Sequence, residues 1–279
     1  MKLFSIPNIT TALNLLCGII AILLALAGRI DIAPFAIYLG AIFDFLDGFL
    51  ARKLNAHSEL GKQLDSLADM VTFGVAPGVL MMVVMIATIY LEGPFYTINF
   101  SSHVHAQLLN WMNAVFNNVP NRMDASIKYL PFTALIIPFM SLFRLAKFNL
   151  DTRQSDSFIG VPTPLNTVFI TFFPLVLAAN YNTWKFNPGI YGILFNSYFL
   201  VAISLLMSIL LIVELPLFSL KFKHFKWKGN EIRYIFLITC GLLIPFLLVW
   251  SIPLIVFLQI ILSVINTQVT KNKAYEIQS

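Results

Sequence analysis

Long apolar stretches separated by short polar connections run through the whole chain. A membrane-spanning helix needs about 20 mostly apolar residues. About eight stretches approach that length, near Thr10–Ala27, Ala33–Ala51, Leu64–Leu91, Ile127–Lys147, Thr163–Ala179, Tyr191–Leu215, Ile232–Trp250 and Ile252–Gln268. The pattern predicts an all-α fold, a polytopic transmembrane helix bundle. Seven spans is the alternative, because the last two stretches, separated by the turn at Trp250–Pro253, could form one broken helix or a re-entrant pair.

The composition agrees with a membrane as the solvent of this chain. Of its 279 residues, 58% are hydrophobic and 11% are charged, a balance that a water-soluble domain could not expose without aggregating. Cys17 and Cys240 lie far apart in apolar runs, which gives no disulfide framework and no thiolate metal site. The first apolar segment imitates a cleavable signal peptide, but its start at Pro7–Thr10 is too polar for one.

The basic residues gather at the ends of the apolar stretches. The net charge of +5 therefore does not indicate a nucleic-acid partner, because no basic patch is interleaved with aromatic residues. With the N-terminus in the cytoplasm, fourteen Lys and Arg residues fall inside, and only Arg29, Arg122, Lys128 and Lys185 fall outside. This bias predicts an even number of spans with both termini cytoplasmic.

One long connection, residues 92–126, is predicted to be external. It contains an amphipathic stretch around Val104–Phe116 that we expect on the outer membrane surface. His103 directly precedes this stretch, and His105 is its second residue. Two imidazoles without a third ligand nearby favour a solvated loop over a metal site.

Four aspartates are concentrated in the second and third apolar stretches. Asp44 and Asp47 are three residues apart, and Asp65 and Asp69 are four apart, so each pair projects from one face of its helix. An aspartate at the centre of a membrane helix costs about 2.5–3.5 kcal/mol, so these side chains should face inward. The short connection between the two stretches predicts antiparallel neighbouring helices that bring the pairs together near the cytoplasmic boundary.

Clustered carboxylates without nearby His or Cys indicate hard divalent cations such as Mg²⁺, Mn²⁺ or Ca²⁺. The small residues Gly48, Ala51 and Gly61 would let a phosphate approach closely, and the Arg52 guanidinium suits phosphate oxygens. These features describe a diphosphate site. Charge and spacing alone also leave open an ion-coupled transporter. Ser58, followed by Glu59, is expected mainly to form the N-cap of the third helix, and contact with a ligand is its alternative role.

The same residues form the pattern Asp44-x-x-Asp47-Gly48-x-x-Ala51-Arg52, eight intervening residues, then Gly61-x-x-x-Asp65-x-x-x-Asp69. This pattern resembles the complete signature of the CDP-alcohol phosphotransferase family. The likeness covers roughly residues 1–214, which would form a six-helix family core with an external insertion at 92–126. Residues 215–279 would add a basic cytoplasmic loop and two further spans.

The resemblance implies the roles of the site residues. Asp44 and Asp65 would each touch two divalent cations, Mg²⁺ or Mn²⁺ with Ca²⁺ as a possible occupant, while Asp47 and Asp69 would each serve one. Gly48 and Arg52 would hold the diphosphate. The remaining positions expected to bind CDP-diacylglycerol are Pro7, Asn8, Ile9, Thr10, Ala51, Ser58 and Gly61. A homodimer is also expected from the family.

Two further blocks resemble membrane-integral bacterial phosphatidylserine synthases. They are Gly61–Pro77, and Phe143–Asn149 together with Phe158–Pro164. The resemblance implies transfer of a phosphatidyl group from CDP-diacylglycerol to L-serine, with release of CMP, in the bacterial cytoplasmic membrane and with the site facing the cytoplasm. Glycerol 3-phosphate or an inositol phosphate is the alternative acceptor.

Serine needs a proton acceptor for its hydroxyl and a cation for its carboxylate. Asp69, if only loosely bound to metal, is the expected proton acceptor. Arg144 is the first candidate to bind the serine carboxylate. Lys147 and Asn149 follow it closely enough to line the same cytoplasmic mouth, although all three could instead anchor the helix at the interface.

Overall fold

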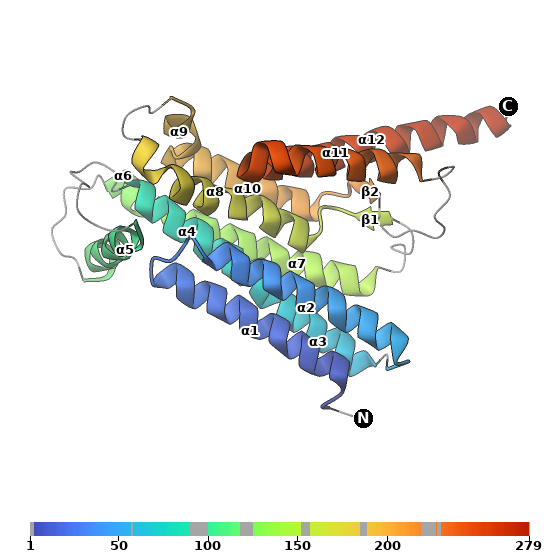
Figure 1. The fold of residues 1–279 in the computed structure, drawn as a ribbon, viewed down its shortest axis with the longest axis horizontal. Coiled ribbons are helices and arrows are strands. Elements are labelled where there is room, and N and C mark those ends of the chain that lie inside the picture. The colour runs from blue at the N-terminus through green and yellow to red at the C-terminus, as the bar shows by residue number, and fades with distance from the viewer. Residues whose placement is uncertain are drawn as a thin grey trace.

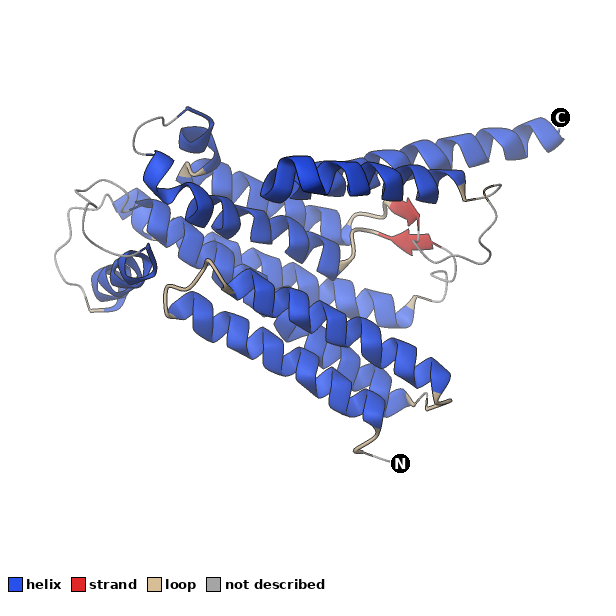
Figure 2. Cartoon of the chain, in the orientation of Figure 1, coloured by secondary structure: helices blue, strands red, loops and turns tan. Residues whose placement is uncertain are grey.

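The computed structural model describes residues 3–56, 58–89, 100–117, 125–151, 157–184, 189–218, 227 and 230–278. In this part of the chain, long helices lie side by side along one axis (Figure 1), and helix dominates throughout (Figure 2). In chain order the elements are α1 (Ile6–Leu26), α2 (Ala33–Lys53), α3 (Glu59–Asp69), the π-helix η1 (Met70–Val75), α4 (Ala76–Ile89), α5 (Phe100–Phe116), α6 (Ala125–Lys128), the 3₁₀ helix η2 (Leu130–Leu135), α7 (Ile136–Leu150), β1 (Ser157–Ile159), α8 (Thr163–Trp184), α9 (Gly189–Leu194), α10 (Ser197–Ile212), β2 (Pro216–Phe218), α11 (Glu231–Leu247), the 3₁₀ turn η3 (Leu248–Trp250) and α12 (Ser251–Gln278).

Among the described residues, five helical stretches are long and apolar enough to cross a membrane: Ile6–Leu26, Ala33–Lys53, Glu59–Ile89, Leu130–Leu150 and Glu231–Asn266. Two shorter apolar helices cover Thr163–Ala179 and Ser197–Ile212. The predicted polytopic helical bundle is therefore confirmed. The number of spans stays a prediction.

One predicted stretch differs from the structure. The stretch Tyr191–Leu215 is not one helix, because the Asn196 side chain accepts hydrogen bonds from the first backbone N–H groups of α10 and starts a new helix there. The last two stretches are two helices, as predicted, and the chain reverses between them at η3, where Leu248 has a φ of 48°. The helices α11 and α12 therefore pack side by side as a hairpin (Figure 1).

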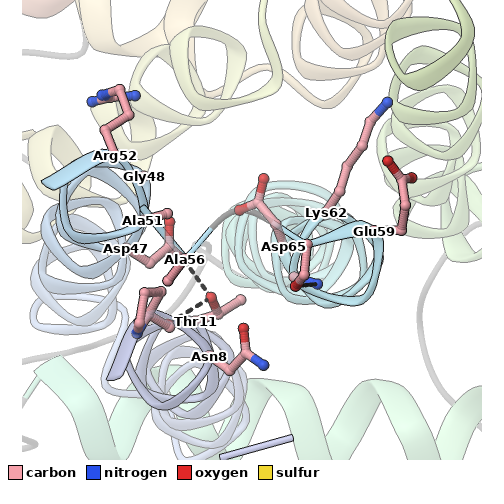
Figure 3. A pocket seen from close by; sticks show the side chains of 13 residues that line it. Asn8, Thr11, Asp47, Gly48, Ala51, Arg52, Ala56, Glu59, Lys62 and Asp65 are labelled. Atoms are coloured by element: carbon pink, nitrogen blue, oxygen red, sulfur yellow. Dashed lines mark hydrogen bonds between the residues drawn. The ribbon is translucent and has the colours of Figure 1, made fainter. Parts of the chain in front are cut away.

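The first three helices form the part of the bundle that carries the aspartates. Helix α1 begins at the N-cap Ser5 with Pro7 in its first turn, and α3 begins at Ser58, whose Oγ accepts a hydrogen bond from the Gly61 N–H at 3.0 Å. This confirms Ser58 as an N-cap. Helix α1 packs against both α2 and α3 and lies between them at the floor of a cleft (Figure 3). The predicted neighbouring helices are confirmed, because carboxylates of α2 and α3 converge and α2 also packs against η1 in the same span as α3.

The third span changes its helical pitch directly after Asp69. Pro77 has no N–H to donate to the carbonyl of Phe73 four residues earlier, and its ring would clash with that carbonyl in a regular α-helix. The chain forms the π-helix η1 there, and the freed Phe73 carbonyl accepts a hydrogen bond from the Thr167 hydroxyl of α8 at 2.9 Å. The π-helix therefore joins the aspartate-bearing helix to the second half of the bundle.

The apolar core centres on α4. A run of its side chains, Leu80, Met81, Val83, Val84, Met85 and Ile86, is at most 1% exposed. Helices α1, α5, α7, α8 and α10 all pack around α4. This central helix fixes the positions of the outer helices, and through them of the polar end that carries the aspartates.

The predicted amphipathic stretch is the helix α5, with Val104, Leu108 and Trp111 on its buried face. The flanking parts of the predicted external connection, residues 92–99 and 118–124, lie outside the described residues. The expectation of a solvated loop at His103 and His105 is wrong. His103 is buried with Nε2 3.0 Å from the Gln107 amide nitrogen, whereas the His105 ring contacts the Leu26 carbonyl.

A short pair of antiparallel strands, which the sequence did not reveal, closes one end of the bundle. Ser157 pairs with Phe218, and Ile159 pairs with Pro216. The pair lies at the same end of the molecule as the N-terminus of α1 (Figure 1). It connects the segment before α8 to the segment after α10.

Candidate active site

The predicted carboxylate cluster is present between α2 and α3. Asp44, Asp47 and Asp65 each offer a carboxylate oxygen, and these three atoms lie within 4.8 Å of one another. Asp47 is 6% exposed and accepts a hydrogen bond from the Thr11 hydroxyl of α1 at 2.5 Å. Helix α1 therefore contributes directly to the geometry of a cluster whose acids come from its two neighbours.

Asp69 lies one helical turn beyond Asp65 and is held by α1. The Asn14 side-chain amide donates to Asp69 Oδ1 at 3.1 Å, and the Asn14 carbonyl accepts from the Thr72 hydroxyl at 2.9 Å. A Cβ at Gly18 would lie 2.5 Å from Thr72 Oγ1, and one at Gly40 would lie 2.8 Å from Thr72 Cγ2. Both glycines are therefore needed for the approach of α1 and α2 to the π-helix that orients Asp69.

A cavity of about 550 Å³ opens beside this cluster (Figure 3). Its lining comes from α1, α2, α3 and the α2–α3 connection: Pro7, Asn8, Thr11, Asp47, Gly48, Ala51, Arg52, Ala56, Ser58, Glu59, Gly61, Lys62 and Asp65. Arg52 on α2 and Lys62 on α3 flank the cavity from opposite sides (Figure 3). Cations at the rim and carboxylates at the base suit a diphosphate that shares divalent cations with the protein.

Gly48 leaves space on the cavity wall. A Cβ at Gly48 would meet only the Arg52 guanidinium, at 3.6 Å, among the atoms within 4 Å. Helix packing therefore does not require a glycine at this position. The glycine leaves open space on the cavity wall, and the use of this space by a phosphate stays a prediction.

Seven of the nine residues expected to bind CDP-diacylglycerol line this cavity. Ile9 and Thr10 do not. Ile9 is 49% exposed on another face of α1, and the Thr10 hydroxyl donates to the Ile6 carbonyl of its own helix. Residues 7, 8 and 11 share one face of a helix, whereas residues 9 and 10 turn away from it.

An apolar groove of about 400 Å³ lies next to the polar cavity, between α1 and α3. Asn8 and Thr11 line both spaces. The rest of its lining is nearly all apolar: Leu3, Phe4, Ile9, Ala12, Leu15, Leu64, Leu67 and Ala68. An amphiphilic molecule could therefore place a polar group in the cavity and an apolar chain in the groove.

Arg144 lies inside the bundle near the end of α7. It is 4% exposed, and its Nε donates to the Val161 carbonyl at 3.2 Å. A basic residue that serves as an interfacial anchor would instead extend its charged group to water. Its burial excludes that role and leaves a planar cation beside the start of α8.

The structure does not bring Lys147 and Asn149 together with Arg144 around one opening. Lys147 forms an exposed ion pair of 2.7 Å with Glu214, after α10. Asn149 instead turns to α3, where its amide donates to the Ser66 hydroxyl at 2.7 Å and its carbonyl accepts from Lys62. Of the three residues predicted to form one serine pocket, only Arg144 is buried. Its role in binding serine stays a prediction.

The carboxylate cluster has the chemistry of a divalent metal site. Its donor atoms are all oxygens, and Asp65 Oδ1 is buried without a hydrogen-bond partner among the described residues. A buried, unpaired carboxylate oxygen is costly unless a cation neutralises it. The residues therefore fit the hard cations that the sequence predicted.

Sequence reasoning missed three polar residues of this site. Thr11 and Asn14 hold Asp47 and Asp69, and Lys62 contributes to the cavity rim. Asn8, Thr11 and Asn14 recur at intervals of three in a helix whose other residues, except Thr10, are apolar or glycine, and this polar stripe was the available signal. No comparable pattern marks Lys62, which reads as one of several basic residues near a helix end.

Comparison with known proteins gives the family. The model of the CDP-alcohol phosphatidyltransferase family matches residues 4–218, which contain every residue of the cavity. The chain is 31% identical over 226 residues to CDP-diacylglycerol–serine O-phosphatidyltransferase of Bacillus subtilis (strain 168), covering 81% of this chain and 94% of that protein.

Two other relatives show the same likeness. The enzyme with that printed name from Helicobacter pylori (strain 26695) is 31% identical over 207 residues, 74% of this chain and 70% of the relative. Archaetidylserine synthase of Methanothermobacter thermautotrophicus is 27% identical over 206 residues, 73% of this chain and 66% of the relative. From the match over residues 4–218 and the identity to the B. subtilis protein, the chain belongs to the CDP-alcohol phosphatidyltransferase family, a family of transferases.

Proposed function

We propose that this protein synthesises phosphatidylserine, transferring the phosphatidyl group of CDP-diacylglycerol to the hydroxyl of L-serine with release of CMP. The observation that carries the proposal is the group of three aspartate oxygens within 4.8 Å beside a cavity flanked by Arg52 and Lys62. The names of the relatives support serine as the acceptor.

Two divalent cations, Mg²⁺ or Mn²⁺ with Ca²⁺ as a possible occupant, are proposed as the cofactors. Asp44, Asp47 and Asp65 would hold them, together with Asp69. Bound there, the cations would neutralise the diphosphate and polarise the phosphorus that is attacked. The chain's own residues then have to position the two substrates around that phosphorus.

The cytidine diphosphate part is assigned to the polar cavity. Gly48 provides room for it, and Arg52 supplies a guanidinium that can form paired hydrogen bonds with phosphate oxygens. On the opposite wall, Lys62 adds a second positively charged side chain. Its ammonium also donates to the Asn149 carbonyl at 3.0 Å. The same residue therefore connects the diphosphate cavity to the end of α7.

The diacylglycerol part is assigned to the bilayer side. The apolar groove between α1 and α3 shares Asn8 and Thr11 with the polar cavity, so one acyl chain can lie there while the diphosphate stays in the cavity. The lipid would then enter sideways from the membrane. Serine and CMP, which are water-soluble, would exchange at the polar end of the bundle.

Serine is assigned to the region where α3 and α7 meet through the hydrogen bonds of Asn149. Arg144 would pair with the serine carboxylate. Asp69 would accept the proton of the serine hydroxyl as that oxygen attacks phosphorus, and the bond from Asn14 fixes the orientation of its carboxylate. A carboxylate is a weak base, so positioning should contribute more to the rate than basicity.

The other acceptors and the other function class rank below this proposal. Glycerol 3-phosphate and inositol phosphate use the same chemistry, but the three relatives compared above are named for serine. An ion-coupled transporter is superseded by membership of a transferase family. The test is purified protein with CDP-diacylglycerol and Mg²⁺ or Mn²⁺, offered each alcohol separately. Serine alone should support rapid release of CMP, and faster release with another alcohol would refute the assignment of serine.

We place the protein in the bacterial cytoplasmic membrane with its active site facing the cytoplasm, on the basis of the positive-inside bias. In intact cells, cysteines introduced at Ser58 and Asn230 should resist a membrane-impermeant thiol reagent, and one at Asn118, outside the described residues, should react. The reverse pattern would reverse the orientation. A homodimer stays a prediction from the family, and cross-linking in the membrane would test it.

A further inference from the structure

The C-terminal hairpin α11–α12 lies beyond the region that matches the family, yet it contacts the strand β2 directly. The Phe218 N–H donates to the Ser263 hydroxyl of α12 at 3.2 Å, and the Phe218 ring meets the Phe236 ring of α11 edge-on with centroids 5.7 Å apart. Ser263 is 1% exposed. Both helices of the hairpin therefore hold the same residue of β2.

The strand β2 in turn holds the segment that precedes α8. It pairs with β1, and just beyond the pair the Gly160 N–H donates to the Leu215 carbonyl at 2.7 Å. The Val161 N–H donates to the Leu210 carbonyl at 3.1 Å. The position of Gly160–Val161 is therefore set by the end of α10 and by β2.

Gly160 makes this contact possible. Its φ of +83° is in the left-handed region, and a Cβ there would lie 2.9 Å from the Leu211 carbonyl oxygen. A residue with a side chain would push the segment away from α10. The close approach places the next residue, Val161, against Arg144.

Val161 supplies the contact that orients Arg144. The buried guanidinium donates through Nε to the Val161 carbonyl, and the described lining of the diphosphate cavity does not include Arg144. An Nε bond fixes the plane of a guanidinium and leaves its two terminal nitrogens for another partner. A change in the position of the Val161 carbonyl would therefore rotate the fork that is proposed to bind serine.

We propose that the hairpin α11–α12 is a positioning element for the acceptor site, in which Ser263 acts through β2 and the Gly160–Val161 segment on the guanidinium of Arg144. This inference rests on the proposed function, since it takes Arg144 to bind the serine carboxylate. Ser263 touches no substrate in this account. Its effect is confined to the acceptor, because the diphosphate cavity is built from α1, α2 and α3.

The experiment compares Ser263→Ala, Arg144→Ala and the double variant with the wild-type protein, all purified in the same phospholipid. Loss of one hydrogen bond in Ser263→Ala should raise the serine KM by about threefold to tenfold and leave the CDP-diacylglycerol KM within about twofold. In the double variant the serine KM should equal that of Arg144→Ala alone, because Ser263 has no route to serine except through Arg144. Additive effects would contradict this.

Two variants control for a purely structural effect. Ser204→Ala removes a buried hydroxyl that bonds to the Leu200 carbonyl of its own helix α10, and it should change both KM values by less than about twofold. Ser263→Cys keeps the size of the side chain with a weak acceptor, so it carries the same prediction should Ser263→Ala fail to fold. A parallel loss of kcat and of affinity for both substrates in the Ser263 variants would overturn the inference.

The outcomes separate this inference from the proposed function. If Arg144→Ala raises the serine KM and the Ser263 variants do not, the positioning role is wrong and the proposed function stands. If neither change affects the serine KM, both the positioning role and the assignment of Arg144 fall. If the wild-type protein does not use serine at all, the proposed function itself fails.

Discussion

The two sides of the proposed site are built in different ways. On the nucleotide side, Asp44, Asp47 and Asp65 lie on two helices joined by a short connection, and their oxygens converge within 4.8 Å. On the acceptor side, Arg144 is placed by a carbonyl from another segment, and that segment is held by a strand pair distant in the sequence. Local chain geometry therefore makes the first side, and long-range contacts make the second.

Substitutions on the two sides should therefore affect different kinetic constants. Changes to the aspartates on the nucleotide side would remove a ligand of the cations proposed to bind the reacting phosphate, so they should lower kcat. Changes on the acceptor side should alter serine affinity first, because the residues there are proposed to bind or orient the second substrate. The expected effects decrease from the carboxylates to the exposed ion pair at Lys147.

The largest effect should come from the carboxylates. Asp44→Asn or Asp65→Asn removes a charged ligand, and CMP release should fall by at least about a thousandfold at saturating substrates. The measurement is turnover of purified protein, with expression and folding checked by size-exclusion chromatography. Near-normal turnover in either variant would refute the metal site.

The next effect should come from Arg144→Ala. Loss of a charge-assisted hydrogen bond worth about 1.5–3 kcal/mol should raise the serine KM by roughly tenfold to a hundredfold, with little change in the KM for CDP-diacylglycerol. Arg144→Lys should recover part of the affinity, because it restores the charge without the planar fork. If CDP-diacylglycerol affinity collapses while serine affinity holds, Arg144 belongs to the nucleotide side.

A smaller effect is expected for Asn149→Ala, which cuts the contact between the two sides. Its side-chain amide bonds to Ser66 on the helix that carries Asp65. Losing one such bond costs about 1 kcal/mol, so kcat should fall by roughly twofold to tenfold. The matched control is Asn113→Ala on α5, where the Asn113 amide oxygen accepts from the exposed side chain of Asn117, directly after the helix. Equal losses in both variants would remove the coupling role of Asn149.

The smallest effect should follow from Lys147→Ala. The ion pair with Glu214 is exposed, and such pairs contribute only about 0.2–1 kcal/mol. We expect the serine KM to change by less than about threefold, and the thermal unfolding temperature to shift little. A rise in serine KM comparable to that of Arg144→Ala would return Lys147 to the serine pocket.

The sequence predicted the nucleotide side well because its signals are local. Aspartates three or four residues apart share a helix face, and the short connection limits where the second helix can go. What the sequence did not show there is that α1 packs against both α2 and α3 and supplies Thr11 and Asn14 to their acids. Helical periodicity gives the face of a helix but not which neighbour it meets.

The acceptor side was less predictable because its contacts depend on pairing between distant segments. The strand pair is only three residues long on each side, and nothing in its local pattern distinguishes it from a loop. The burial of Arg144 follows from the contact with Val161, seventeen residues away. A basic residue near a helix end reads as an interfacial anchor until the partner segment is known.

The most direct test of the central claim is the stoichiometry of the reaction in one preparation of the protein. Wild-type protein with CDP-diacylglycerol, Mg²⁺ or Mn²⁺ and isotopically labelled serine should form one labelled lipid for each CMP released, and Asp44→Asn should form neither. CMP release without labelled lipid, or equal product formation by Asp44→Asn, would contradict phosphatidyl transfer to serine at this carboxylate cluster.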